Sequence, residues 1–109
     1  MSNEMNCPKC KVHVDEHEAG FCLSKWASSL LSDGFYAPCS TDIRVAMRMV
    51  DECGSNFRLE KQYYGEPPYH YLAWECWVGY KMSGGHVWES DDAALAITRA
   101  LIKAAHNGN

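Results

Sequence analysis

The part of this sequence that most constrains its fold is a group of metal-binding residue types between Cys7 and Cys22. Three of the six cysteines and two of the five histidines fall within these sixteen residues. The spacing Cys7-x2-Cys10-x6-His17-x4-Cys22 supplies four donors of the kind that a zinc ion takes in tetrahedral geometry. His13 is a rival to His17 for the third position. Because four protein ligands leave no open coordination position, we expect this zinc to be structural and not catalytic.

Length and charge restrict the class of protein further. A chain of 109 residues favours one domain over residues 1–109, because two separate cores would each be small. Hydrophobic residues make up 47% of the chain, which is typical of a globular protein. A net charge of −4 disfavours proteins that follow nucleic-acid phosphates. No apolar run is long enough for a membrane span. The polar N-terminus does not resemble a signal peptide, so we expect a cytoplasmic protein with reduced thiols.

Apolar periodicity predicts three helices. The first covers residues 16–32, with Asp15 and Glu18 as a capping box, and would place His17 in its first turn. The second begins with Ser40 or Thr41 as its cap, and Asp42 favours the positive end of the helix. The third begins after the polar residues Ser90, Asp91 and Asp92 and has an alanine-rich face that suits close packing.

Alternating polarity predicts strands in the second half of the chain. Residues 57–64 and 69–81 form two long strands, separated by a turn that contains two prolines. After a turn at residues 82–85, the segment 86–88 is long enough for only a short third strand.

These elements define an α+β fold with a small antiparallel sheet, two long strands plus one short, packed by three helices in the order α-α-β-β-(β)-α. Residues 7–22 would form a zinc-binding clasp at the N-terminus. Residues 23–106 would form the helix and sheet sandwich.

One face of the predicted sheet is a candidate binding surface. The even-numbered residues of the second strand are apolar and are expected to face the helices, whereas the opposite face combines aromatic and charged side chains. Its candidate ligand-binding or partner-binding residues are Arg58, Tyr64, Tyr71, Glu75 and Trp77. Flat aromatic rings beside an arginine could stack a purine base. Two alternatives are that a helix covers this face and makes it core, or that it forms a homodimer interface.

The sequence predicts no catalytic site. Cys39, Asp42, His70 and His86 have the chemistry of a thiol–imidazole site, but no local motif connects them. Glu75 among the aromatic residues is expected to pair with Arg58. Binding of double-stranded RNA is also disfavoured, because the start of the last helix is acidic where that module carries lysines.

Several short strings resemble a known family. They are His17-Glu18-Ala19-Gly20 with Cys22, Leu23 and Trp26; Ser40-Thr41-Asp42-Ile43 with Ala46 and Val50; and Ala93, Ala94, Ile97, Arg99, Ala100 and Leu101. Spread over residues 7–105, these strings resemble small tailed-bacteriophage proteins with a phage ABA sandwich domain. The resemblance implies a helix–sheet–helix sandwich and a phage or prophage origin. The family helix usually carries an acidic residue after the leucine, where this chain has Ser24.

Together these features predict a non-enzymatic phage accessory protein that binds its target in the cytoplasm of the bacterial host and inhibits host defence. The target would be a host protein or a small nucleotide signal, held by aromatic side chains and an arginine such as Arg44, Arg48 or Arg58. The alternative is a zinc-containing, nucleic-acid-associated protein of phage replication or regulation, which the acidic net charge disfavours.

Overall fold

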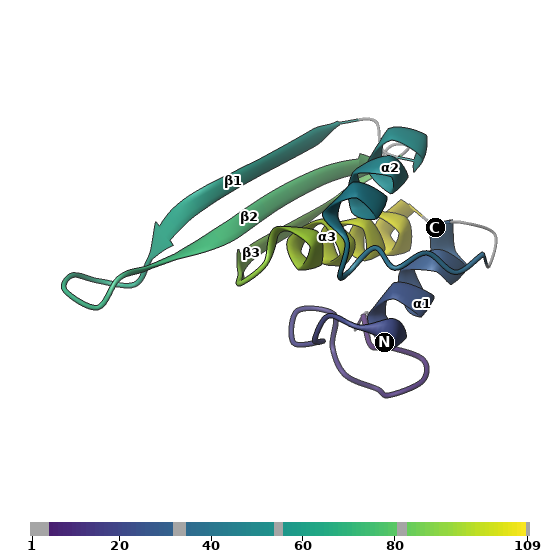
Figure 1. Ribbon diagram of the computed structural model, residues 1–109, viewed down its shortest axis with the longest axis horizontal. Helices are drawn as coiled ribbons and strands as arrows, with labels where there is room; N and C mark the ends of the chain where they lie inside the picture. The colour runs from purple at the N-terminus through teal and green to yellow at the C-terminus, as the bar shows by residue number, and fades with distance from the viewer. Residues whose placement is uncertain (1–4, 32–34, 54–55, 81–82, 109) are drawn as a thin grey trace.

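The computed structural model describes residues 5–31, 35–53, 56–80 and 83–108, which form helices and an antiparallel sheet (Figure 1). In chain order the elements are α1 (Phe21–Leu31), α2 (Ile43–Cys53), β1 (Phe57–Tyr64), β2 (Tyr71–Tyr80), β3 (Ser83–Ser90) and α3 (Ala93–Gly108). The sheet has the strand order β1-β2-β3, and both strand pairs are antiparallel. The predicted α+β class and element order are therefore confirmed.

Helix α1 begins at Phe21, more than one turn later than predicted. The expected capping box does not form, because the Asp15 carboxylate pairs with the ammonium of Lys103 at 2.6 Å and lies in an irregular segment before the helix. Gly20 ends that segment with a φ of 146°, a backbone conformation that residues other than glycine rarely adopt. His17 consequently lies in the irregular segment and not in the first turn of α1.

The cap of α2 also differs from the prediction. Asp42 is the capping residue, since its Oδ1 accepts the backbone N–H of Arg44 at 3.0 Å. Ser40, one of the two predicted caps, is buried and its hydroxyl lies 2.7 Å from the hydroxyl of Ser24 on α1. The Ser24 position, where the resembled family carries an acid, is therefore a buried polar contact between α1 and the segment before α2.

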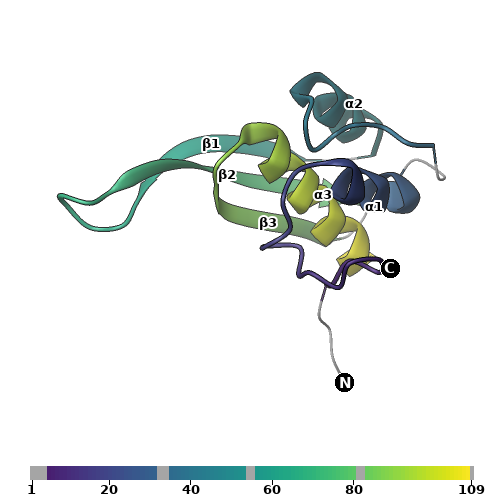
Figure 2. The same ribbon diagram turned by 60° about the horizontal axis from the view of Figure 1, so that its bottom comes forward.

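Helix α3 lies at the centre of the fold. It packs on β3 and β2 with one side, while α1 and α2 pack on α3 from the other side (Figures 1 and 2). Residues 93–102 are all buried, including Thr98 and Arg99, because the sheet covers one side of α3 and the helices α1 and α2 pack on the other. The described layers are thus the sheet, then α3, then α1 and α2, and not the helix–sheet–helix order that the family resemblance implies. None of the three helices covers the opposite face of the sheet, which we call the open sheet face.

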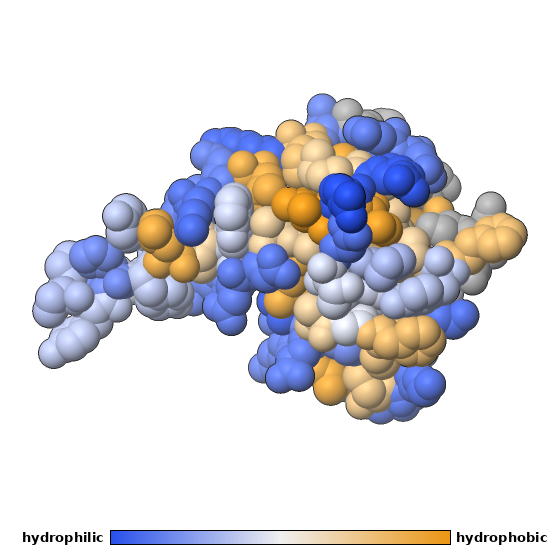
Figure 3. Space-filling view, viewed as in Figure 1, coloured by the Kyte–Doolittle hydropathy of each residue, from blue (hydrophilic) through white to orange (hydrophobic). Residues whose placement is uncertain are grey.

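The β1–β2 hairpin extends beyond the helices (Figure 1). Helix α3 covers only the part of β2 that pairs with β3, so Cys76 and Val78 are buried there as predicted. Farther along the hairpin, Tyr63 and Leu72 are directly opposite each other but are 69% and 48% exposed. The prediction that Leu72 faces the helices was wrong because no helix reaches this end. Figure 3 shows an apolar spot on this projecting part, with hydrophilic residues around it.

Strand β3 has eight residues, as many as β1, and is not the short strand predicted. The glycines that suggested a turn, Gly84 and Gly85, lie inside the strand. A Cβ atom at Gly85 would overlap the backbone oxygen of Ala100 and lie 2.6 Å from the backbone nitrogen of Ala104. Gly85 therefore allows the close approach of β3 and α3.

We expect Gly85→Ala to lower the free energy of unfolding by at least about 2 kcal/mol, because overpacking a core costs on the order of 1–3 kcal/mol. Urea unfolding followed by tryptophan fluorescence would measure the loss. Gly84→Ala is the matched control, since a Cβ there would contact only the Val78 oxygen, at 3.2 Å. Equal losses in the two variants would contradict the assignment of the close contact to Gly85.

Candidate metal centre and open sheet face

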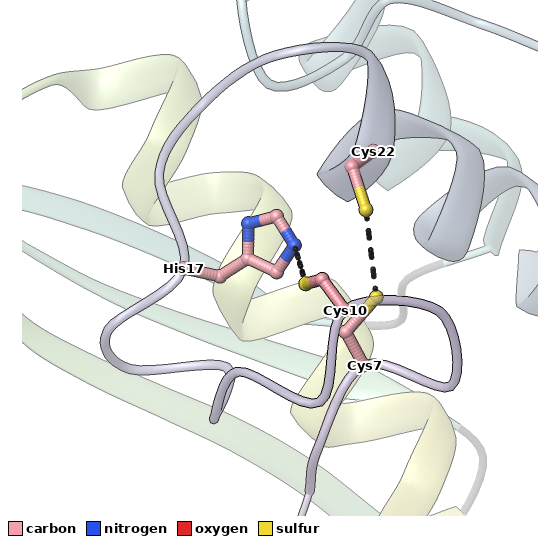
Figure 4. Close-up of side chains that lie close together, drawn as sticks. All are labelled: Cys7, Cys10, His17 and Cys22. Carbon is pink, nitrogen blue, oxygen red and sulfur yellow. Dashed lines mark hydrogen bonds between the residues drawn. The ribbon is translucent and has the colours of Figure 1, made fainter.

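The four predicted metal ligands come together in one cluster (Figure 4). The ligand atoms of Cys7, Cys10, His17 and Cys22 all lie within 4.8 Å of one another. The sulfur atoms of Cys7 and Cys22 are 3.6 Å apart, and the Cys10 sulfur is 3.2 Å from Nε2 of His17. Ligands at about 2.1–2.3 Å from a tetrahedral ion lie roughly 3.6–3.8 Å from each other, so the cluster is close to the required size. None of these cysteines forms a disulfide.

The first two cysteines are presented by a tight turn. The backbone N–H of Lys11 donates to the carbonyl of Cys7 at 2.9 Å, and the N–H of Cys7 donates to the carbonyl of Val12 at 2.9 Å. Lys11 has a φ of 67°, which reverses the chain directly after Cys10. The turn brings two sulfur atoms to the same side of the chain, and the start of α1 supplies the third from Cys22 (Figure 4).

The histidine ligand is oriented by the backbone. Nδ1 of His17 donates to the carbonyl oxygen of Glu18 at 2.8 Å, so the lone pair of Nε2 remains available to a metal ion. His13, the rival ligand, lies outside the cluster, because its Nδ1 accepts the backbone N–H of Asp15 at 3.1 Å. Of the two histidines left open by the sequence, the structure places His17 with the cysteines.

The electrostatics of the cluster favour a bound cation. Burial acts to raise the pKa of the Cys7 thiol, but backbone N–H groups of Cys10 and Lys9 donate to its sulfur and lower that pKa to about 6. Burial, together with the adjacent sulfur atoms of Cys7 and Cys10, raises the pKa of Cys22 to about 11. The thiolates of Cys7 and Cys22 would repel each other, so a bound cation would stabilise their ionised forms.

Two cationic side chains from α3 hold this segment in place, and sequence reasoning did not identify either. Lys103 pairs with Asp15, as described above, and also donates to the carbonyl of His86 at 3.0 Å. Arg99 donates from Nε and Nη2 to the carbonyl of His17, at 3.2 and 2.6 Å. The role of Arg99 could have been suspected from the sequence, because it is a charged residue in the alanine-rich part of α3 that was expected to pack closely.

A ladder of stacked side chains crosses the open sheet face. Arg58, Trp77 and His86 lie directly opposite one another on β1, β2 and β3. The Trp77 and His86 rings are stacked, with centroids 4.1 Å apart and planes inclined by 5°, and Cζ of Arg58 lies 4.8 Å from the Trp77 centroid. Both faces of the Trp77 indole are therefore covered by this chain. A base could stack on Trp77, as predicted from the sequence, only if Arg58 or His86 moved.

Glu75 is the polar partner of the ladder. Its carboxylate accepts a hydrogen bond from the amide of Gln62 and lies 2.6 Å from Nε2 of His86. Arg58 does not pair with Glu75 as expected, because it pairs with Glu60 at 2.6 Å. Glu60 and Glu75 lie directly opposite each other on β1 and β2, where two negative charges would repel. Arg58 offsets the charge of Glu60, and His86 and Gln62 bind the carboxylate of Glu75. His86 also lies on this face, although it was not among the five residues predicted for it.

The two tyrosines predicted for the face lie beside each other, with ring centroids 6.2 Å apart. The Tyr71 hydroxyl donates to the carboxylate of Glu89 at 2.6 Å. The Tyr64 hydroxyl is buried without a hydrogen-bond partner, and its burial and the charges of Glu75 and Glu89 raise its pKa. All five predicted face residues thus lie on one side of the sheet, and each of them contacts another side chain of the same face or of β3.

The thiol–imidazole residues considered from sequence are not brought together. Cys39 is fully buried, and burial raises its pKa. His70 contacts Tyr63 at the far end of the hairpin, with ring centroids 4.9 Å apart, whereas His86 belongs to the ladder. Asp42 caps α2. Within the described residues, this set forms no nucleophile–base pair.

Comparisons with protein-family models, with curated proteins and with solved structures found no significant match. The resemblance to phage ABA sandwich proteins therefore stays a prediction. Among the described residues, no helix combines the length and apolarity needed to cross a membrane.

Replacing one histidine at a time tests the ligand assignment. His17→Ala is expected to reduce metal affinity by more than the roughly 10–100-fold that follows loss of a hydrogen bond to a metal ligand. His13→Ala is the matched control and is expected to leave metal affinity unchanged. Competition with a chromophoric chelator would measure both affinities. A larger loss for His13→Ala than for His17→Ala would contradict the cluster.

Proposed function

We propose that this chain is a non-enzymatic binding protein, in which a structural zinc ion holds the N-terminal segment and the open sheet face contacts a partner. The metal part rests on the Cys7, Cys10, His17 and Cys22 cluster. Three thiols and one imidazole suit zinc, whereas magnesium and calcium prefer oxygen ligands. Four protein ligands leave no position for a substrate, which supports a structural role.

The observation that carries the binding proposal is the stacked ladder of Arg58, Trp77 and His86 on a sheet face without a helix above it. Trp88 lies at the edge of this ladder, since its ring is 4.7 Å from that of His86 and 5.7 Å from the ammonium of Lys103 on α3, and the residue is 53% exposed. Trp, Tyr and Arg are the residue types enriched at binding hot spots. Because stacking already orders these side chains, a partner would lose little side-chain entropy on binding them.

A protein partner fits this face better than a nucleotide. A nucleotide base needs an open aromatic ring face, and both faces of Trp77 are covered by Arg58 and His86. A protein surface can instead bury the edge of the ladder together with the exposed rings of Tyr71 and Trp88. We accordingly favour the host-protein target over the nucleotide signal.

The biological setting of the proposal comes from the sequence resemblance. We place the chain in a tailed phage or prophage, acting in the cytoplasm of the bacterial host as an inhibitor of host defence. The alternative of a zinc-containing, nucleic-acid-associated protein is disfavoured by the net charge of −4, because contacts with phosphates need basic side chains.

Native mass spectrometry is expected to show one zinc ion per chain. Chelation should then increase alkylation of the exposed Cys10 while the buried Cys39 and Cys76 stay unlabelled. The burial that raises the pKa of Cys76 to about 12 keeps that thiol protonated. Peptide mapping after alkylation would measure each site. Equal labelling of Cys10 with and without chelator would contradict the metal centre.

Affinity capture from a bacterial host lysate tests the open sheet face. The Trp88→Ala and Arg58→Ala variants are each expected to weaken capture of the partner by at least about 30-fold, because hot-spot residues contribute roughly 2 kcal/mol or more. Arg48→Ala, which changes an exposed arginine on α2, should bind like the natural chain. Quantitative titration of the captured partner would measure the three affinities.

The result that contradicts the proposal is equal binding by all three variants. Light scattering on the purified chain would detect a homodimer. Loss of that dimer in Trp88→Ala would assign the face to a second copy of the chain in place of a host protein.

A further inference from the structure

Arg99 is a buried cation that forms no direct ion pair within the described part of the chain. It lies on α3 and is only 9% exposed. None of the ion pairs between described residues includes it, although Lys103 on the same helix pairs with Asp15. Asp15 and Asp91 are near enough to favour the charged form of Arg99, but neither pairs with it directly, so its hydrogen bonds must compensate for the burial of the charge.

The three hydrogen bonds of Arg99 join the metal segment to the sheet. Nε and Nη2 donate to the carbonyl oxygen of His17, as described above, and Nη1 donates to the hydroxyl of Ser90 at 3.1 Å. Ser90 is available because β3 has an irregular register before it and Glu89 has a φ of 61°. This bulge turns Ser90 to the same face of the sheet as Val87, toward α3.

The residue that accepts two of these bonds is itself a proposed metal ligand. Arg99 fixes the peptide carbonyl of His17, and Nδ1 of the same residue is fixed by the carbonyl of Glu18. The imidazole is thus held both through its backbone and through its ring. In addition, a zinc ion with three thiolates and a neutral imidazole carries a single net negative charge, which a nearby guanidinium would offset.

We propose that Arg99 is a positioning residue of the metal centre, which orients His17 through its carbonyl and supplies the counter-charge for a three-thiolate zinc site. The inference rests on the proposed zinc centre. It requires the planar fork of arginine, since the ammonium of lysine does not present Nε and Nη2 together.

The experiment compares the zinc affinities of Arg99→Met, Arg99→Lys and Lys103→Met with that of the natural chain. Lys103→Met is the matched control because it removes the same charge from α3 and also loosens the N-terminal segment, but it does not contact a ligand residue. Arg99→Met is expected to lower zinc affinity about 10–100-fold, the usual effect of removing a hydrogen-bond partner of a metal ligand. Arg99→Lys should lose less, and Lys103→Met less than about threefold.

Thermal unfolding with and without zinc separates positioning from general stability. Arg99→Met should lower the melting temperature of the zinc-loaded protein by more than that of the metal-free protein, which loses only the hydrogen bonds to His17 and Ser90. An equal decrease in both forms would overturn the proposal, and so would unchanged zinc affinity. If Arg99→Met does not fold, the affinity of Arg99→Lys decides by the same criterion. A natural chain that takes up no zinc would overturn the metal centre itself.

Discussion

The contact between α3 and the strands β2 and β3 is the interaction on which the other parts of the fold depend. Gly85 has no side chain that would hold α3 away from the sheet, and the small alanine side chains of α3 allow its backbone to approach the layers on both sides of the helix. Helices α1 and α2 have no comparable contact with the sheet and pack on α3 instead. Because a single helix fills the space between two layers, it is buried all round, and the opposite face of the sheet has no helix to cover it.

The N-terminal segment depends on the same helix. Residues 5–20 contain no helix or long strand. Val14 anchors them in the hydrophobic core, and the polar side chains of Arg99 and Lys103 hold them against α3. The ligand cluster and the two cationic side chains therefore add to the core contacts of this segment, and a metal ion bound by the cluster would stabilise it further. The open sheet face is ordered differently, by stacking and by the hydrogen bonds of Glu75, which leaves its outer edge available for a partner.

Sequence patterns predicted the features that depend on residue type and local spacing. The Cys-x2-Cys turn, the apolar alternation of β1 and the alanine-rich α3 are all local signals, and each appeared where expected. The predictions were wrong where a contact with a residue far away in the sequence determines the local structure. Gly84 and Gly85 have the composition of a turn but serve packing against α3, and Asp15 looks like a cap but pairs with Lys103. Likewise, no local pattern reveals that Trp77 lies between Arg58 and His86, because that arrangement needs three strands in register.

The central position of α3 has a consequence for how the protein is made. Every other layer packs on this helix, yet it is synthesised after all of them. Until residues 93–105 have left the ribosome, the apolar faces of the earlier elements have no helix to pack against. These elements are the β1–β2 hairpin and the helices α1 and α2. Completion of this fold therefore waits for α3, and capture of a metal ion by Cys7, Cys10 and Cys22, which are synthesised before it, would occupy their thiols during that delay.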